Sequence, residues 1–334
     1  MATKVLQEPM LSPNIKLDPL LWNVELPLQH TYHPLGFSAE IETNSPVVLV
    51  GAEQSWGQFQ KRFDGPPVHF DITVVEGRSP NCPPLTICRA RHNLMVQVAN
   101  DENFAVMHLR QGLACGWLTQ AVAENLGYLR YAFLESVVST LLEVQYLTSV
   151  HAACVELNGR GLLLCGDSGA GKSTLALACA RSGWGFLADD ACKLLRDNEE
   201  RVVVGNPHQI RFRESAIELF PELKQQRVTR RSTGKLAIEL ATATLPGIRT
   251  IYECPVDYIV FLNRRGTDRP RLSGYPKNEA MQWFEELITW GDADLREAHR
   301  VSLRKLLSAE VFELRYSSLT AAVARLETLI RTGS

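Results

Sequence analysis

Two patterns of hydrophobic and polar residues divide the chain. Up to about residue 125, short alternating runs such as PVVLVGA, VHFDITVVEG and LMVQVAN are separated by turn-forming stretches such as DGPP and SPNCPP. A period of two is typical of strands with one buried face. Between 128 and 147 the apolar residues recur every three or four positions, which predicts a packed helix. We therefore expect a mostly β N-terminal domain over 1–125 and a bridging helix over 126–147.

Beyond residue 148 the pattern predicts a mixed α/β domain that extends to residue 334. The stretch HAACVELNGRGLLLC indicates two strands joined at Asn158-Gly159, a dipeptide that favours tight hairpin turns. A helix over TLALACARSG and a short strand over GFLADD are expected next, and the tail from 277 is predicted to be largely helical. The expected fold class is thus α/β, with a separate mostly β N-terminal domain.

A glycine-rich loop separates the second strand of this hairpin from the helix. Gly166, Gly171, Lys172 and Ser173 fit the pattern G-x-x-x-x-G-K-[ST], in which backbone amides surround nucleotide phosphates. The lysine of this motif contacts the β- and γ-phosphates, the hydroxyl binds Mg²⁺, and the helix N-terminus adds partial positive charge. The predicted nucleotide-binding residues of the loop are Gly166, Asp167, Ser168, Gly169, Ala170, Gly171, Lys172, Ser173 and Thr174.

Other chemical groups lie close to this loop in the sequence. Asp189 and Asp190 end a strand, where carboxylates can hold Mg²⁺ or accept a proton from an attacking group, although an exposed acidic turn is the plainer alternative. In HQIRFR, Gln209, Arg211 and Arg213 share one strand face, and their guanidinium groups could bind phosphate or form salt bridges. Lys235 follows a flexible STG and is a further candidate phosphate contact.

Composition and charge exclude several classes of protein. Of 334 residues, 45% are hydrophobic and 22% are charged, the net charge is −2 and no long basic block occurs, so we expect no nucleic-acid partner. No apolar run approaches about 18 residues and the N-terminus lacks a signal-peptide pattern, so neither a membrane span nor secretion is expected. Eight cysteines without a C-x-x-C pair indicate a reduced, cytoplasmic protein.

The order and spacing of three motifs resemble a known family. His151, fifteen residues before Gly166, followed by GDSGAGKS and by ADD from Ala188, is similar to the catalytic domain of HPr kinase/phosphorylase over about 148–215. That bacterial enzyme phosphorylates a serine on a small carrier protein, and its P-loop domain is similar to that of phosphoenolpyruvate carboxykinase. The resemblance implies a P-loop kinase fold of this type over 148–334, ATP and Mg²⁺ as cofactors, and a homo-oligomer.

The resemblance also implies roles for single residues. Lys172 and the loop would hold the β- and γ-phosphates, and Asp189, tuned by His151, would take the proton of the acceptor hydroxyl. Ser173, Asp190 and Gln209 would place Mg²⁺. The family has a Glu-Ile-Arg-Gly signature where this chain has QIRF, so an amide at Gln209 replaces a metal-binding carboxylate.

Three hypotheses about function follow. The first is an ATP-dependent phosphotransferase that acts on a hydroxyl in a protein, a peptide or a small molecule. The second is a nucleotide-binding regulatory module without transfer activity, which the loss of a carboxylate at Gln209 favours. The third, a small-molecule enzyme closer to the carboxykinases, lacks a convincing set of carboxylate-binding arginines. Residues 1–125 do not match the family's N-terminal domain, which disfavours HPr as the acceptor, and we expect them to recognise the acceptor or a partner, or to build the oligomer.

Overall fold

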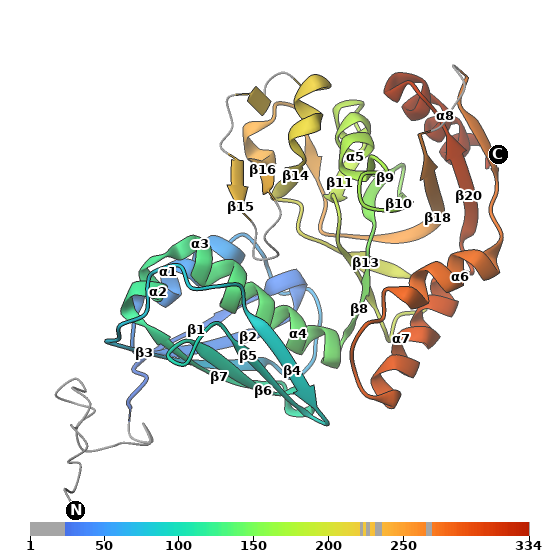
Figure 1. Ribbon diagram of the computed structural model, residues 1–334. Coiled ribbons are helices and arrows are strands. Elements are labelled where there is room, and N and C mark those ends of the chain that lie inside the picture. Colours follow the sequence, from blue (N-terminus) through green and yellow to red (C-terminus); the bar gives the residue numbers. More distant parts are fainter. Residues whose placement is uncertain (1–23, 221–222, 225–227, 231–235, 265–268, 334) are drawn as a thin grey trace, which may run out of the picture. The chain divides into compact units, whose positions relative to one another are not determined.

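The computed structural model describes residues 24–333 apart from 221–222, 225–227, 231–235 and 265–268 (Figure 1). The chain forms two compact units, residues 1–145 and 146–334. The helical segment expected as a bridge lies almost entirely within the first unit.

The first unit contains a β-rich sheet, as the alternating pattern predicts. Its seven strands lie in the order β1-β2-β3-β7-β6-β5-β4, with β2, β3 and β7 parallel to one another and the other pairs antiparallel. The strands are β1 (Leu28–Tyr32), β2 (Ala39–Thr43), β3 (Val68–Val75), β4 (Ile87–Arg91), β5 (Leu94–Val98), β6 (Phe104–His108) and β7 (Leu113–Thr119).

A helical layer lies on one side of this sheet, with α1 to α4 on the same side in Figure 1. It comprises α1 (Pro46–Trp56), α2 (Gln120–Glu124), α3 (Leu126–Tyr128), the π-helical segment η3 (Leu129–Leu134) and α4 (Glu135–Gln145), with short 3₁₀ turns at η1 (Pro34–Gly36) and η2 (Leu109–Gln111). The prediction of a strand over PVVLVGA was wrong, because that run begins α1. Pro46 stands at the first helical position, where its fixed φ and missing N–H are tolerated.

The second unit is built on a ten-stranded mixed sheet. Eight strands follow the order β17-β11-β9-β10-β18-β13-β12-β8, and β20 pairs with both β18 and β19. The strands are β8 (Leu147–Val150), β9 (Ala153–Leu157), β10 (Arg160–Cys165), β11 (Gly185–Ala188), β12 (Cys192–Leu195), β13 (Val202–Val204), β17 (Arg249–Thr250), β18 (Glu253–Asn263), β19 (Arg271–Gly274) and β20 (Glu310–Arg315). The hairpin expected at Asn158-Gly159 is confirmed, and both residues have positive φ.

Helices and a small sheet complete the second unit. The helices are α5 (Lys172–Arg181), α6 (Lys277–Glu286), α7 (Ala293–Leu306) and α8 (Leu319–Thr332), and the 3₁₀ segments are η4 (Glu214–Glu218) and η6 (Thr242–Thr244). A three-stranded sheet has the order β14 (Gln209–Phe212), β16 (Leu236–Ala241), β15 (Val228–Arg230). Among the described residues, no helix is long and apolar enough to cross a bilayer.

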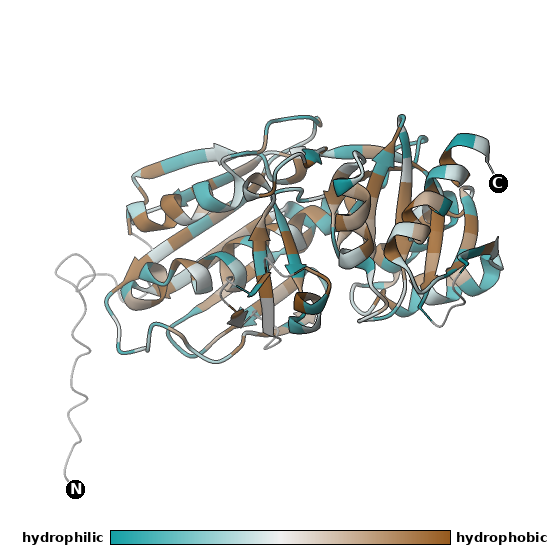
Figure 2. Ribbon diagram, turned by 90° about the horizontal axis from the view of Figure 1, so that it is seen from above, coloured by the Kyte–Doolittle hydropathy of each residue, from teal (hydrophilic) through white to brown (hydrophobic). Residues whose placement is uncertain are grey.

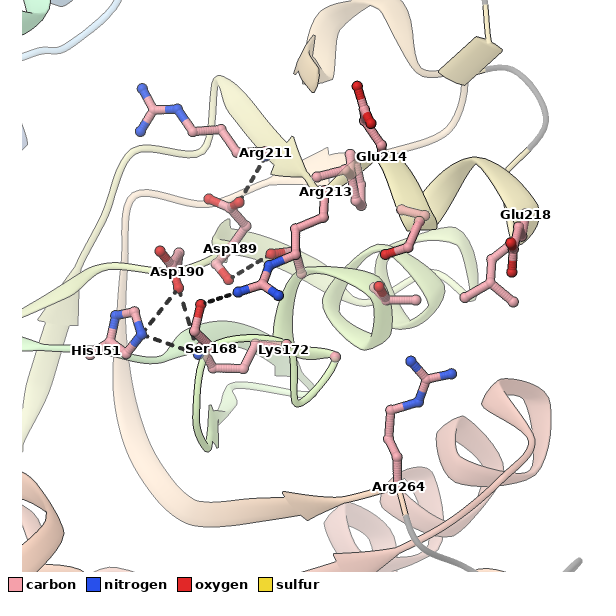
Figure 3. Close-up of a pocket in the computed structure, with 18 residues that line it drawn as sticks. His151, Ser168, Lys172, Asp189, Asp190, Arg211, Arg213, Glu214, Glu218 and Arg264 are labelled. Carbon is pink, nitrogen blue, oxygen red and sulfur yellow. Dashed lines mark hydrogen bonds and ion pairs between the residues drawn. The ribbon is translucent and has the colours of Figure 1, made fainter. Parts of the chain in front are cut away.

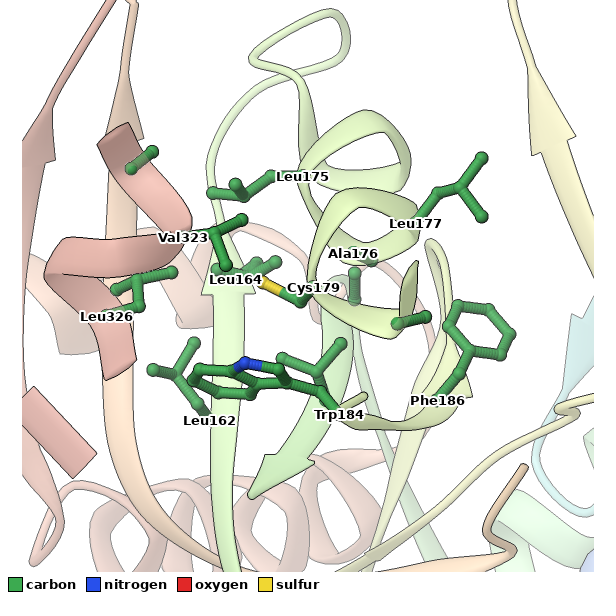
Figure 4. Packing of buried hydrophobic residues seen from close by; sticks show 14 of the residues in the cluster. Leu162, Leu164, Leu175, Ala176, Leu177, Cys179, Trp184, Phe186, Val323 and Leu326 are labelled. Carbon is green, nitrogen blue, oxygen red and sulfur yellow. The ribbon is translucent and has the colours of Figure 1, made fainter. Parts of the chain in front are cut away.

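The core of the second unit fixes the position of α5. Leu162 and Leu164 of β10 are fully buried, and hydrophobic residues dominate the central strands of this sheet (Figure 2). Leu175 and Cys179 of α5 pack in the same cluster as Val323 of α8 (Figure 4). Since α5 is held between the sheet and other apolar elements, the loop that joins β10 to α5 has rigid supports at both ends.

Candidate nucleotide-binding site

The glycine-rich loop runs from the end of β10 to the start of α5. Gly166, Gly169 and Gly171 all have φ between 98° and 139°, a backbone conformation that L side chains rarely adopt. The space around the loop is also tight, because a Cβ on Gly171 would lie 3.0 Å from the Tyr316 hydroxyl oxygen. The glycines therefore permit a backbone path that a larger residue would disturb, as the sequence motif requires.

Lys172, the first residue of α5, carries its ammonium group into the loop. Its side chain is only 5% exposed, and Nζ donates to the carbonyl oxygens of Gly166 at 2.8 Å and Asp167 at 3.4 Å. His151 Nε2 lies 3.2 Å from the same Nζ, and Asp190 Oδ1 lies 3.7 Å from it. The positive charge is therefore fixed at the N-terminus of α5, where the helix dipole also favours an anion.

The two aspartates that follow β11 occupy different surroundings. Asp190 Oδ1 lies 3.5 Å from His151 Nε2 as well as close to Lys172, and its side chain is 35% exposed (Figure 3). Asp189 is 8% exposed, and its Oδ2 accepts a hydrogen bond of 2.8 Å from the backbone N–H of Arg211. The structure thus pairs His151 with Lys172 and Asp190, and it orients Asp189 through the neighbouring strand β14.

Gln209 and Arg211 lie on β14, Arg213 directly follows it, and these side chains have different partners. Arg211 donates from Nε to Glu239 at 2.8 Å and from a terminal nitrogen to the amide oxygen of Gln209 at 3.0 Å. Arg213 donates to the hydroxyl of Ser168 in the glycine-rich loop. Arg213 therefore bonds to the loop directly, although the sequence prediction selected Arg211. Lys235 lies outside the described residues.

A cavity of about 870 Å³ brings most of the predicted residues together. The P-loop and α5 contribute Ser168, Gly169, Gly171, Lys172, Ser173 and Thr174, and the other predicted members are His151, Asp189, Asp190 and Arg211. The lining that the sequence prediction did not include in the site is Phe212, Arg213, Glu214, Ser215, Ala216, Glu218, Leu219 and Arg264. Gly166, Asp167 and Ala170 belong to the loop without lining the cavity, and Gln209 is also not among the lining residues.

Arg264 and Tyr316 reach the loop from neighbouring strands. Arg264 follows β18, which pairs parallel with β10, and Tyr316 follows β20, which pairs parallel with β18. Both side chains lie within about 3 Å of the position that a Cβ on Gly171 would occupy. Burial raises the pKa of Tyr316 to about 12, and its hydroxyl has no hydrogen-bond partner among the described residues. The sequence feature that could have identified Arg264 as a site residue is its position directly after an apolar strand. The carboxyl ends of parallel strands lie at the same edge of a sheet.

The site contains oxygen donors that suit a divalent cation. Ser173 Oγ lies 3.4 Å from the backbone oxygen of Asp189, and both aspartates line the same cavity. No group of three or more His, Cys, Asp or Glu side chains in the described part of the chain could hold a metal ion without other ligands. This fits Mg²⁺ in nucleotide sites, where one or two carboxylates act together with phosphate oxygens and water.

Comparisons with known proteins agree with this geometry. Residues 143–218 match the model of the HPr Serine kinase C-terminal domain family. An HPr kinase/phosphorylase from Halalkalibacterium halodurans is 38% identical over 79 residues, which are 23% of this chain and 26% of that protein. Another from Enterococcus faecalis is 27% identical over 170 residues, which are 42% of this chain and 53% of that protein.

The chain therefore spans about half, or less, of the length of the curated relatives that it matches. The solved structure of the HPr(Ser) kinase/phosphatase from Coxiella burnetii is 16% identical, with a TM-score of 0.31 over 56% of this chain and 95% of that one. With its loop, its histidine and its aspartate pair in the matched segment, this chain contains an HPr serine kinase C-terminal domain region and is a distant relative of the HPr kinase/phosphorylases.

Proposed function

We propose that the protein is an ATP-dependent phosphotransferase that phosphorylates a hydroxyl group. The observation that supports this most strongly is the convergence of the P-loop, Lys172, His151 and the two aspartates on one cavity. Phosphoryl transfer needs charge balance and positioning more than covalent chemistry, and a fixed ammonium beside two carboxylates supplies both. The likeness to HPr kinase/phosphorylases supports the same reaction type for a different acceptor, since residues 1–142 lie outside the matched family segment.

The residues would divide the work as follows. Lys172 Nζ and the loop amides bind the β- and γ-phosphates, and Arg213, which already contacts Ser168, adds positive charge above the loop. Ser173 and Asp190 hold Mg²⁺, which shields the phosphate charge when bound. The acceptor oxygen forms a bond to the γ-phosphorus while the bond from that phosphorus to the β–γ bridging oxygen breaks, and Asp189 takes the hydroxyl proton. His151 positions Asp190 and Lys172.

The test compares two isosteric variants with ATP and candidate serine acceptors. Asp189→Asn keeps the shape of the side chain but removes the proton acceptor, so transfer should be lost while ATP binding remains within about threefold. The matched control is Asp197→Asn, an exposed aspartate beyond the far end of β12, which should transfer phosphate at the unchanged rate. Full transfer by Asp189→Asn would contradict the assignment of the base.

A second function, a nucleotide-binding module without transfer, is favoured by one observation. Gln209 stands where the related family has a carboxylate, and its amide oxygen accepts a bond from Arg211. Such a module would bind ATP with Mg²⁺ and show neither ADP formation nor phosphorylated acceptor. Measurement of ADP release in the presence of a panel of hydroxyl acceptors separates the two proposals.

A further inference from the structure

The sheet of the first unit has one face that the helical layer does not cover. The side chains on the covered face are buried, among them Ile41, Phe70 and Met107. On the opposite face apolar side chains are open to solvent, with Leu94 52% and Leu113 40% exposed. An exposed apolar area that extends over several strands is typical of a surface that binds another protein.

The strand register places the side chains of this open face in rows across the sheet. One row runs Gln29, Glu42, Asp71, Cys115, Val106, Val96, Arg89, from β1 to β4. The next row runs Thr31, Glu40, His69, Leu113, His108, Leu94, Arg91. A third contains Thr73, Trp117, Phe104, Val98 and Ile87, and in it Trp117 stacks on Phe104 at 5.1 Å.

Charge is separated along these rows. The carboxylates Glu40 and Glu42 lie on β2, a third carboxylate, Asp71, lies beside them on β3, and the guanidinium groups of Arg89 and Arg91 lie on β4. Between these charges the side chains of β7, β6 and β5 on this face are mostly apolar. Glu42 shares a row with Arg89, and Glu40 shares a row with Arg91. The open face is therefore acidic over β2 and β3, basic on β4 and mostly apolar over β7, β6 and β5.

We propose that this open face binds the same face of a second copy of the chain. In this arrangement a two-fold axis runs parallel to the strands, between β6 and β7. Each row of one copy then lies opposite the same row of the other copy, with the β2 and β4 ends of the row exchanged. Glu42 of one copy then faces Arg89 of the other, and Glu40 faces Arg91, while β6 and β7 pack against each other. A two-fold axis across the strands would instead place carboxylate against carboxylate, so the charge pattern selects one of the two arrangements.

The size of the face fits a reversible dimer. With the axis between β6 and β7, six strands of the sheet, β2 to β4 in spatial order, face strands of the other copy. Spaced about 4.8 Å apart they span about 24 Å, and five to eight residues at about 3.4 Å give about 17–27 Å of length. The projected area is therefore roughly 400–650 Å² per copy. Two copies would bury about 800–1,300 Å², which extends from the range of transient interfaces to the low end of stable ones. Facing sheets pack about 10 Å apart, a gap that Glu and Arg side chains at the rim can bridge.

The experiment uses the full chain and two single charge reversals, Glu42→Arg and Arg89→Glu. Each variant alone places like charges opposite each other twice in the dimer, so sedimentation should show a dissociation constant raised about tenfold or more. In an equimolar mixture both contacts between positions 42 and 89 again join opposite charges, and the contacts between Glu40 and Arg91 are unchanged, so the mixture should form a heterodimer with nearly the original constant. Glu124→Arg, at an exposed position on α2, is the control that should dimerise unchanged.

Three results would overturn the proposal. The first is an unmodified chain that stays monomeric up to about 100 µM, which would leave another protein or residues 1–23 as the occupant of the face. The second is a dimer that neither charge reversal weakens, and the third is a pair of weakened variants that do not restore each other on mixing. Leu113→Glu should also prevent dimerisation, because it places a charge in the apolar centre. ATP binding by each variant should stay unchanged, so failure here is distinguishable from failure of the proposed activity.

Discussion

Lys172→Met tests whether the P-loop is the phosphate site. The variant keeps the apolar stem of a side chain that is 5% exposed and removes an ammonium with four polar neighbours within 3.7 Å. A hydrogen bond from a charged donor is worth about 1.5–3 kcal/mol. If its bond to phosphate is worth about 2.7 kcal/mol, ATP affinity falls about 100-fold.

That loss can be measured as a thermal shift. A ligand that binds only the folded state stabilises it by mass action, so at saturating ATP a 100-fold weaker affinity removes about 2.7 kcal/mol of stabilisation. For a unit of the size of 146–334, about 2–4 °C accompany each kcal/mol, so the ATP-induced shift in Tm should shrink by roughly 5–11 °C. Lys277→Met, at the exposed start of α6, should keep the full shift. An equal shift in both variants would refute the assignment of Lys172.

Three further predictions concern neighbours of this site. Gly171→Ala forces a Cβ to φ 101° beside the Tyr316 hydroxyl, so calorimetry should show ATP affinity at least tenfold weaker, and unchanged affinity would contradict the steric argument. Gln209→Glu should pair with Arg211 and leave the Mg²⁺ midpoint at fixed ATP unchanged, whereas a lower midpoint would support the metal role expected from the sequence. Burial raises the pKa of Tyr316 to about 12 in the folded protein, so as pH rises past about 10 the unfolded chain loses this proton first. The contribution of the neutral hydroxyl to the free energy of unfolding is fully present below pH 10 and is lost towards pH 12. Tyr316→Phe should reduce that loss by about 1–3 kcal/mol in denaturant titrations, and an identical pH profile would refute it.

The sequence was most informative where local rules determine the structure. The hairpin at Asn158-Gly159 followed from turn chemistry, and the loop-to-helix junction at Lys172 followed from glycine spacing. The helix α1 was missed because its apolar residues are not confined to one face, so the run resembled a buried strand. A helix packed on several sides loses the amphipathic period on which such predictions depend.

Contacts that depend on tertiary placement could not be predicted from the sequence. Asp189 and Asp190 are adjacent in the chain and follow the end of β11, and adjacency alone does not determine which carboxylate contacts which partner. The sequence therefore identified the pair as functional, but only the structure shows that Asp190 contacts His151 and Lys172 while Asp189 is oriented by the Arg211 amide.

The arginines make the same point about the whole site. Arg211 lies on β14 and Arg213 directly follows it. The sequence prediction selected Arg211 as a phosphate contact, although sequence alone gives no reason to prefer either arginine. The structure separates them, because Glu239 pairs with Arg211, while Arg213 extends to Ser168 in the glycine-rich loop. Arg264 was not predicted to belong to the site, yet β18 runs parallel to β10 and ends at the same edge of the sheet. A motif thus locates the phosphate-binding loop, and the order of parallel strands determines which distant cations can reach it.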